Sequence, residues 1–174
     1  MIPTFQQVRL TLDVEARAGF DPAPANQTEA GVKAGEMDHH LTWAASLLRD
    51  GYLEDAYARY EKAEIAAAGA VMSLTGARLK NEYRGREHHF KKHFLVAALT
   101  AAGRPAPALE QAISISHVRN LIDYNASVGV AQLTPQNLDV ARQVTDRVRS
   151  SVLGLLAEAN IAVAPVKGLP LPQR

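Results

Sequence analysis

Hydrophobic residues recur at three- and four-residue intervals along most of the chain, which is the spacing of amphipathic helices. One such line begins with Leu53, Ala56 and Tyr60, and glycine or proline separates the successive segments. Thr134-Pro135 is a clear helix start, because a capping hydroxyl precedes proline at the first helical position. The pattern predicts five helices, over about residues 38–50, 52–81, 86–102, 106–127 and 135–159.

The first 36 residues follow a different pattern. Val8, Leu10, Leu12 and Val14 alternate with polar residues, which is the periodicity of a β-strand. A lone strand is unstable, so it would pair within the chain or with a second copy, or the segment is no strand. The proline-containing stretch at residues 21–26 is typical of an irregular linker. We therefore interpret the first 36 residues as an arm.

The five helices predict an all-α fold, an antiparallel four- to five-helix bundle with short connections. The expected organisation is an N-terminal arm over residues 1–36, a helical bundle over 37–160 and a proline-rich tail over 161–174. The length of 174 residues agrees with a single domain.

Composition narrows the class of protein. Aromatic residues make up only 6% of the chain and alanine is abundant, which favours closely packed helices over a β-sandwich. The 19 lysines and arginines nearly balance the 18 acidic residues, which excludes a polybasic coat but not a local basic patch. The absence of cysteine excludes disulfides, thiolate metal sites and a cysteine nucleophile. With no long apolar run and no signal-peptide pattern, we expect a cytoplasmic protein that does not contact membranes.

Basic side chains gather between residues 80 and 93. Arg84, Arg86, Lys91 and Lys92 are candidates for binding phosphates. The alternative interpretation is a solvated polar helix face without a ligand.

The histidines in the same stretch raise the question of a metal site. His89 and His93 lie one helical turn apart, so both imidazoles could reach one divalent ion. A third ligand is missing and the neighbouring lysines repel a cation, so we expect no metal here. His39 and His40 are adjacent and face different ways, which indicates surface histidines.

The densest polar cluster lies in the fourth predicted helix. Arg119 and Asp123 have the i, i+4 spacing of an ion pair, with Asn120 next to the arginine, and His117 and Tyr124 share one face seven residues apart. Isoleucines on the same helix indicate that much of it is buried. The polar groups therefore form either an internal hydrogen-bond network or the floor of a cleft.

The stretch from about residue 41 to 152 resembles a HEPN domain, a helical-bundle family of prokaryotic toxin–antitoxin and defence systems. One matching segment has leucines before a glycine–tyrosine turn and an A-x-x-R-x-Y run, and another has three alanines, a loop, a histidine and F-x-x-x-F. The most specific segment is R-N-x-x-D-Y. These segments are residues 44–60, 66–94 and 119–124.

The resemblance implies roles for the residues of the R-N-x-x-D-Y motif. Active HEPN ribonucleases carry an arginine, a polar residue and then a histidine, and two copies cut RNA without metal. Arg119 and Asn120 match the first two positions, and Tyr124 stands where the histidine is expected. The resemblance thus implies Arg119, Asn120 and Tyr124 as catalytic candidates, supported by Asp123 and His117. Because no histidine follows Arg119, ribonuclease activity is either unusual in its base or lost.

The resemblance also implies partners. The aspartate–tyrosine ending is similar to a branch of the family that accompanies a minimal nucleotidyltransferase, which modifies the tyrosine corresponding to Tyr124. We expect a homodimer that binds RNA or nucleotide in the groove between two copies, without a cofactor. The alternative is a non-catalytic helical interaction module, in which the R-N-x-x-D-Y motif only braces its helix and the protein binds a partner chain. A metal-dependent enzyme is a more distant third hypothesis.

Overall fold

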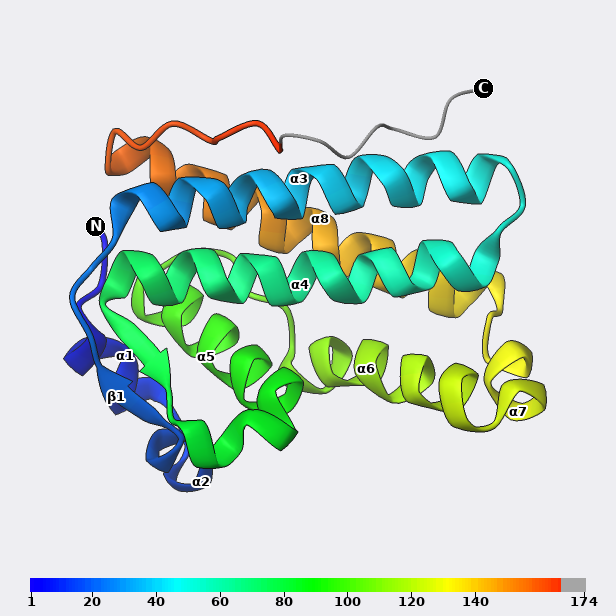
Figure 1. Cartoon of the computed structure of the whole chain (residues 1–174), viewed down its shortest axis with the longest axis horizontal. Helices are drawn as coiled ribbons and strands as arrows, with labels where there is room; N and C mark the ends of the chain where they lie inside the picture. Colours follow the sequence, from blue (N-terminus) through cyan, green and yellow to red (C-terminus); the bar gives the residue numbers. More distant parts are fainter. Residues whose placement is uncertain (167–174) are drawn as a thin grey trace.

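The computed structural model describes residues 1–166, and it confirms the predicted all-α helical bundle (Figure 1). Three long helices, α3, α4 and α8, run alongside one another, and α5 and α6 pack on α4. The elements in chain order are α1 (Phe5–Thr11), α2 (Val14–Ala18), β1 (Phe20–Pro22), α3 (Gln27–Arg49), α4 (Leu53–Thr75), β2 (Ala77–Leu79), the 3₁₀ helix η1 (Asn81–Arg86), α5 (Glu87–Ala101), α6 (Leu109–Tyr124), α7 (Ala126–Ala131) and α8 (Pro135–Glu158).

The core has two parts because α5 and α6 cover different halves of α4. One cluster joins α5 to the alanine-rich second half of α4, around Ala67 and Val71, and includes Phe90 and Phe94. The other cluster joins α6 to the first half of α4 through Tyr57 and its neighbours. Helices α5 and α6 therefore meet beside the middle of α4, and their junction is where polar side chains gather.

The strand pattern of residues 8–14 is misleading, and the alternative that this segment is no strand is correct. Residues 5–11 form helix α1, which starts with a capping box between Thr4 and Gln7. The side chains of Phe5, Val8 and Leu12 are buried at helical spacing, whereas Leu10 is 79% exposed. The segment thus packs into the bundle core instead of extending from it.

The strand of the first 36 residues lies later, at β1. It pairs antiparallel with β2, and Phe20 lies opposite Leu79. Gly76 precedes β2 with a left-handed φ of +74° and ends α4 at Thr75, six residues before the predicted end. After Gly76 the chain leaves the direction of α4 and pairs with β1 as β2.

The predicted boundary at residue 36 falls inside α3. This helix begins at Gln27, where the Asn26 side chain accepts a hydrogen bond from the Glu29 amide at 2.9 Å. Asp38, the predicted cap, instead forms an ion pair with Arg149 of α8 at 2.6 Å. The arm and the bundle are therefore one packed unit.

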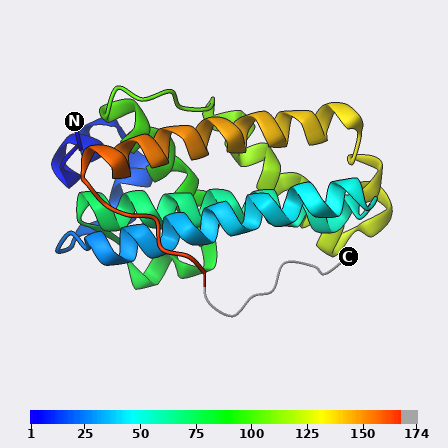
Figure 2. The same cartoon turned by 90° about the horizontal axis from the view of Figure 1, so that it is seen from above.

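The first part of the predicted tail is also docked. The Ala164 amide donates to the Gly31 carbonyl at 3.0 Å, and Figure 2 shows this segment crossing α3. A Cβ atom at Gly35 would lie 1.8 Å from the Ala164 carbonyl oxygen, so only glycine permits this approach. The rest of the predicted tail, residues 167–174, lies outside the described residues.

Across residues 1–166, no helix combines the length and hydrophobicity that crossing a bilayer requires.

Candidate functional site

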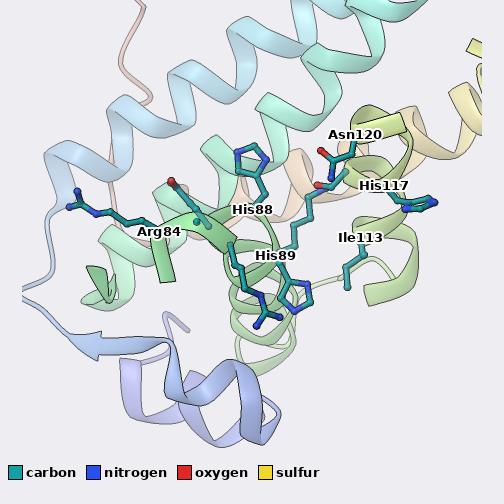
Figure 3. Close-up of a pocket in the computed structure, with 11 residues that line it drawn as sticks. Arg84, His88, His89, Ile113, His117 and Asn120 are labelled. Atoms are coloured by element: carbon teal, nitrogen blue, oxygen red, sulfur yellow. The ribbon is translucent and has the colours of Figure 1, made fainter. Parts of the chain in front are cut away.

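A cavity of about 440 Å³ lies between the start of α5 and the middle of α6 (Figure 3). Its volume falls within the range of small-molecule sites, about 300–1,000 Å³. One wall comes from η1 and α5, and the other comes from α6. Most of the side chains that line it are cationic or polar, and three are imidazoles. The lining residues are Arg84, Gly85, Arg86, Glu87, His88, His89, Lys92, Ile113, Ser116, His117 and Asn120.

Helix α6 has one face buried in the core and an opposite face that lines the cavity. Ile115, Val118 and Ile122 are buried in the core. The opposite face carries residues at i, i+3, i+4 and i+7, which lie together along a helix. These cavity-lining residues are Ile113, Ser116, His117 and Asn120.

Three helices meet at a buried carboxylate below the cavity. Glu61 of α4 is only 6% exposed. Its Oε1 accepts a hydrogen bond from the Ser116 hydroxyl at 2.7 Å and lies 3.0 Å from Nδ1 of His88. Because a carboxylate can only accept, Nδ1 carries the proton of this hydrogen bond. The other ring nitrogen, Nε2, makes no contact with Glu61. The His88 side chain is 55% exposed, so solvent and ligands can reach it.

The contact between His88 and Glu61 changes the proton affinity of both groups. The hydrogen bond to Glu61 raises the pKa of His88, although partial burial acts in the opposite direction. Burial would raise the pKa of Glu61, but hydrogen bonds from His88 and Ser116 and the charge of Lys92 lower it overall. Glu61 therefore stays ionised and holds an imidazole whose pKa lies above its ordinary value.

A second buried pair lies next to the first. Nζ of Lys92 is 2.5 Å from Oε2 of Glu64 and donates to the Ala112 carbonyl at 2.6 Å. Both charged side chains are fully buried. Burial raises the pKa of Glu64 to about 7, against the lowering effect of Lys92. This pair joins α4, α5 and α6 beneath the cavity.

Contacts from helix α2 and its capping residue fix the start of α5, which forms one wall of the cavity. Asp13 caps α2 by accepting from the Ala16 amide at 2.7 Å, and its other oxygen lies 2.8 Å from Nδ1 of His93. Arg86 lies 3.0 Å from Glu15 of the same helix. Helix α2, which the strand prediction missed, thus fixes the start of α5.

The His89 and His93 rings lie side by side, with centroids 4.4 Å apart. Burial lowers the pKa of His89, and the nearby His93 and Arg86 add to this effect. Among residues 1–166, no three histidine, aspartate or glutamate side chains converge in a way that could hold a metal ion.

The four residues predicted to bind phosphates divide between two cavities. Arg86 and Lys92 line the first cavity, although the Lys92 ammonium lies beneath it. Lys91 pairs with Glu87 and lines an adjoining cavity of about 260 Å³. Arg84 borders both cavities, and Figure 3 shows its side chain directed away from His89 and Ile113.

The R-N-x-x-D-Y motif is only partly at the cavity. Asn120 and His117 line it. Arg119 instead points along the flank of α6 and pairs with Asp123 at 2.6 Å, with 27% of its side chain exposed. Tyr124 is 88% exposed at the end of the helix. Within the described chain, the three candidate catalytic residues are therefore not gathered around one point.

Sequence reasoning missed Glu61, Glu64 and Ser116, and it did not assign His88 a role. A signal was present for one of them. Glu64 falls on the predicted apolar line of its helix, four residues after Tyr60 and three before Ala67. An acidic residue on a buried face needs a partner, but the identity of that partner depends on which helices pack together.

Comparison of the chain with protein-family models, with curated proteins and with solved structures yields no significant match.

Proposed function

We propose that this protein binds RNA or a nucleotide through phosphate groups in the cavity between α5 and α6. The observation that carries the proposal is the convergence of Arg86, His88, His89 and His117 with the amide of Asn120 in one cavity. Guanidinium groups and imidazole N–H groups bind phosphate oxygens, and an amide can bond to a base or ribose.

The local charge supports the same ligand class. Residues 78–92 carry six lysines and arginines and two glutamates, in a chain whose net charge is only +1. The adjoining cavity continues this basic surface with Lys33, Arg78 and Lys91. Surface ion pairs such as Arg86–Glu15 are weak, so a phosphate can replace the carboxylate at little cost. We infer that the first cavity takes one nucleotide unit and that the adjoining surface follows the backbone of a single strand.

The test is binding of a labelled single-stranded RNA by fluorescence anisotropy at several salt concentrations. Arg86→Gln should weaken binding and reduce the slope of log affinity against log salt by about 0.7 for each lost phosphate contact. The matched control is Arg9→Gln, because Arg9 is exposed on α1 and does not line the cavity. Equal behaviour of the two variants would contradict the proposed site. Competition with a mononucleotide measures how much of the affinity belongs to one unit.

We further propose that the protein is a HEPN-like member of a prokaryotic toxin–antitoxin or defence-type pair. The helical bundle and the placement of the motif on an amphipathic helix support this resemblance. The hydroxyl of Tyr124 is accessible to a nucleotidyltransferase-type partner, since 88% of the side chain is exposed. Incubating the protein with such an enzyme and ATP, and mapping the modified residue by mass spectrometry, tests this part.

A homodimer is part of the same proposal. Exposed apolar side chains gather where α7 meets the α3–α4 turn, and a cavity of about 420 Å³ opens between Tyr52 and Val130. We place the contact with a second copy, or with a partner protein, at this surface. Light scattering should show a dimer that Val130→Glu dissociates. A monomeric wild-type protein would contradict the dimer without affecting the phosphate site.

A further inference from the structure

The contact between His88 and Glu61 has the form of a proton-transfer site rather than a surface ion pair. The carboxylate is buried and holds Nδ1 of the imidazole at 3.0 Å, and Ser116 fixes the same oxygen from the other side. The imidazole itself is half exposed and lines the cavity. An imidazole oriented by a buried carboxylate and open to a ligand on its other nitrogen is the arrangement of a general base.

We propose that His88 is the general base for cleavage of an RNA strand bound in this cavity, with Glu61 as its positioning residue. This proposal rests on the proposed function, because the substrate must bind there first. It places the chemistry on α5, away from the arginine-led motif of α6.

The reaction needs only groups that the chain and the substrate provide. The 2′-oxygen of a ribose attacks the adjacent phosphorus while Nε2 of His88 takes the 2′-hydroxyl proton. A P–O2′ bond forms and the P–O5′ bond breaks, and the imidazolium returns the proton to the departing 5′-oxygen. The products are a 2′,3′-cyclic phosphate and a 5′-hydroxyl end. Arg86, on the same cavity, offsets the charge that develops on the phosphate oxygens.

The charged groups around His88 shift the pH range in which it can act as a base. Glu61 of α4 and Glu87 of α5 raise the pKa of His88, whereas Lys92 of α5 lowers it. From α6, Ser116 contacts Glu61 rather than the imidazole. A base must be neutral to accept the proton, so the rate should rise with pH through the His88 pKa.

The experiment measures binding and cleavage of one labelled RNA in the presence of EDTA, together with the DNA strand of the same sequence. Wild-type protein should bind both strands and cleave only the RNA, because DNA lacks the 2′-hydroxyl. His88→Ala should lose about 100-fold or more in rate at saturating RNA, where a loss of affinity does not enter the rate. Added imidazole should restore part of this rate, which a purely structural role of His88 would not allow.

Glu61→Gln tests the positioning role. Glutamine keeps an acceptor for Ser116 but removes the charge that raises the His88 pKa. The rate should fall, and the acidic limb of the pH profile should move to lower pH. His40→Ala is the matched control, because His40 lies on α3 against Arg59 and outside the cavity, and it should cleave like wild type. Thermal melts confirm that each variant is folded.

The outcomes separate the two proposals. RNA that binds at the cavity but is not cleaved, or is cleaved equally by His88→Ala, overturns the assignment of His88 and leaves the binding function standing. RNA that does not bind overturns the proposed function itself.

Discussion

Lys92 and Glu64 form an ion pair that is closed to solvent, with Nζ 2.5 Å from Oε2 and both side chains fully buried. The second carboxylate oxygen of Glu64 is buried without a hydrogen-bond partner among the described residues. Burial raises the pKa of Glu64 to about 7, so the carboxyl gains a proton easily near neutral pH. The pair connects the middle of α4 to α5, and through the Ala112 carbonyl to α6.

Removing the lysine should destabilise the fold in a pH-dependent way. Lys92→Met leaves Glu64 buried without its cation, and breaking a buried pair costs about 3–5 kcal/mol. The pKa of Glu64 is already above its unfolded value, and losing Lys92 raises it further. Folding therefore binds a proton, and the stability of the variant falls as pH rises from about 5 to 8. Urea unfolding at several pH values measures this, with Lys92→Met/Glu64→Leu as the control that removes both charges. A loss that does not vary with pH would contradict the raised pKa.

Asp13 should contribute stability that is lost at low pH. The backbone amide of Ala16 lowers the pKa of Asp13, and His93 adds to the shift against some desolvation. Because the folded-state pKa lies below the unfolded value, the contribution is present above about pH 4 and disappears as pH falls through the folded pKa. Asp13→Ala removes the cap and should cost about 1 kcal/mol at pH 6.

Asp13→Asn separates the cap from the charge. Asparagine keeps an acceptor for the Ala16 amide but carries no charge beside the His93 imidazole. Its stability should fall below that of wild type at pH 6, and this gap should narrow toward pH 3. Chemical denaturation at the two pH values decides this, and an equal gap at both would mean that the charge contributes nothing.

Gly35 should be essential for docking of residues 161–166. A Cβ atom there would overlap the Ala164 carbonyl oxygen at 1.8 Å, so Gly35→Ala should displace this segment from α3. We expect Gly35→Ala to lower the stability of the fold, whereas replacing glycine by alanine within a helix normally raises it by about 0.5–1 kcal/mol. Gly69→Ala is the matched control, since its Cβ would meet only the flexible side chain of Lys33 at 3.3 Å or more.

Hydrogen exchange of the Ala164 amide measures directly whether residues 161–166 stay docked on α3. The Ala164 amide donates to Gly31 in the folded protein, so its exchange should accelerate in Gly35→Ala and stay slow in Gly69→Ala. A thermal melt should rank Gly69→Ala at or above wild type and Gly35→Ala below it. Slow exchange in both variants would show that α3 accommodates the methyl group by shifting.

The pairing of Arg119 with Asp123 makes a prediction about the motif of α6. Any phosphate that binds Arg119 must compete with this carboxylate at 2.6 Å. Asp123→Asn should therefore raise RNA affinity by about two- to fivefold, the equivalent of up to about 1 kcal/mol for an exposed pair. Asp139→Asn is the control, because Asp139 pairs with Arg142 on α8 at the same 2.6 Å and the net charge changes equally. Equal gains in both variants would assign the effect to overall charge rather than to Arg119.

The helices could be predicted from the sequence because their signals are local. The spacing of apolar residues and the Thr134-Pro135 start place α5, α6 and α8 within a few residues of their observed bounds. The same local reasoning failed at residues 8–14, where alternation resembled a strand. The capping box of Thr4 and Gln7 and the burial of Phe5, Val8 and Leu12 favour a helix instead.

Part of the candidate site could be predicted from the sequence. The basic stretch around Arg86 and the polar face of α6 at His117 and Asn120 were both identified, and the fold brings them to one cavity. Arg119 and Tyr124 were grouped with them by sequence, but the turn of the helix carries Arg119 to the flank.

The sequence by itself determined the helical class, the positions of α5, α6 and α8 and the charge of each helix face, because these follow from the order of neighbouring residues. Only the tertiary structure decided that Glu61 meets His88, 27 residues away, and Ser116, 55 residues away. Such contacts depend on which helices pack together and on how far each helix is shifted along its neighbour. A buried carboxylate must find its partners across those helix contacts, since desolvation leaves it no other way to remain charged.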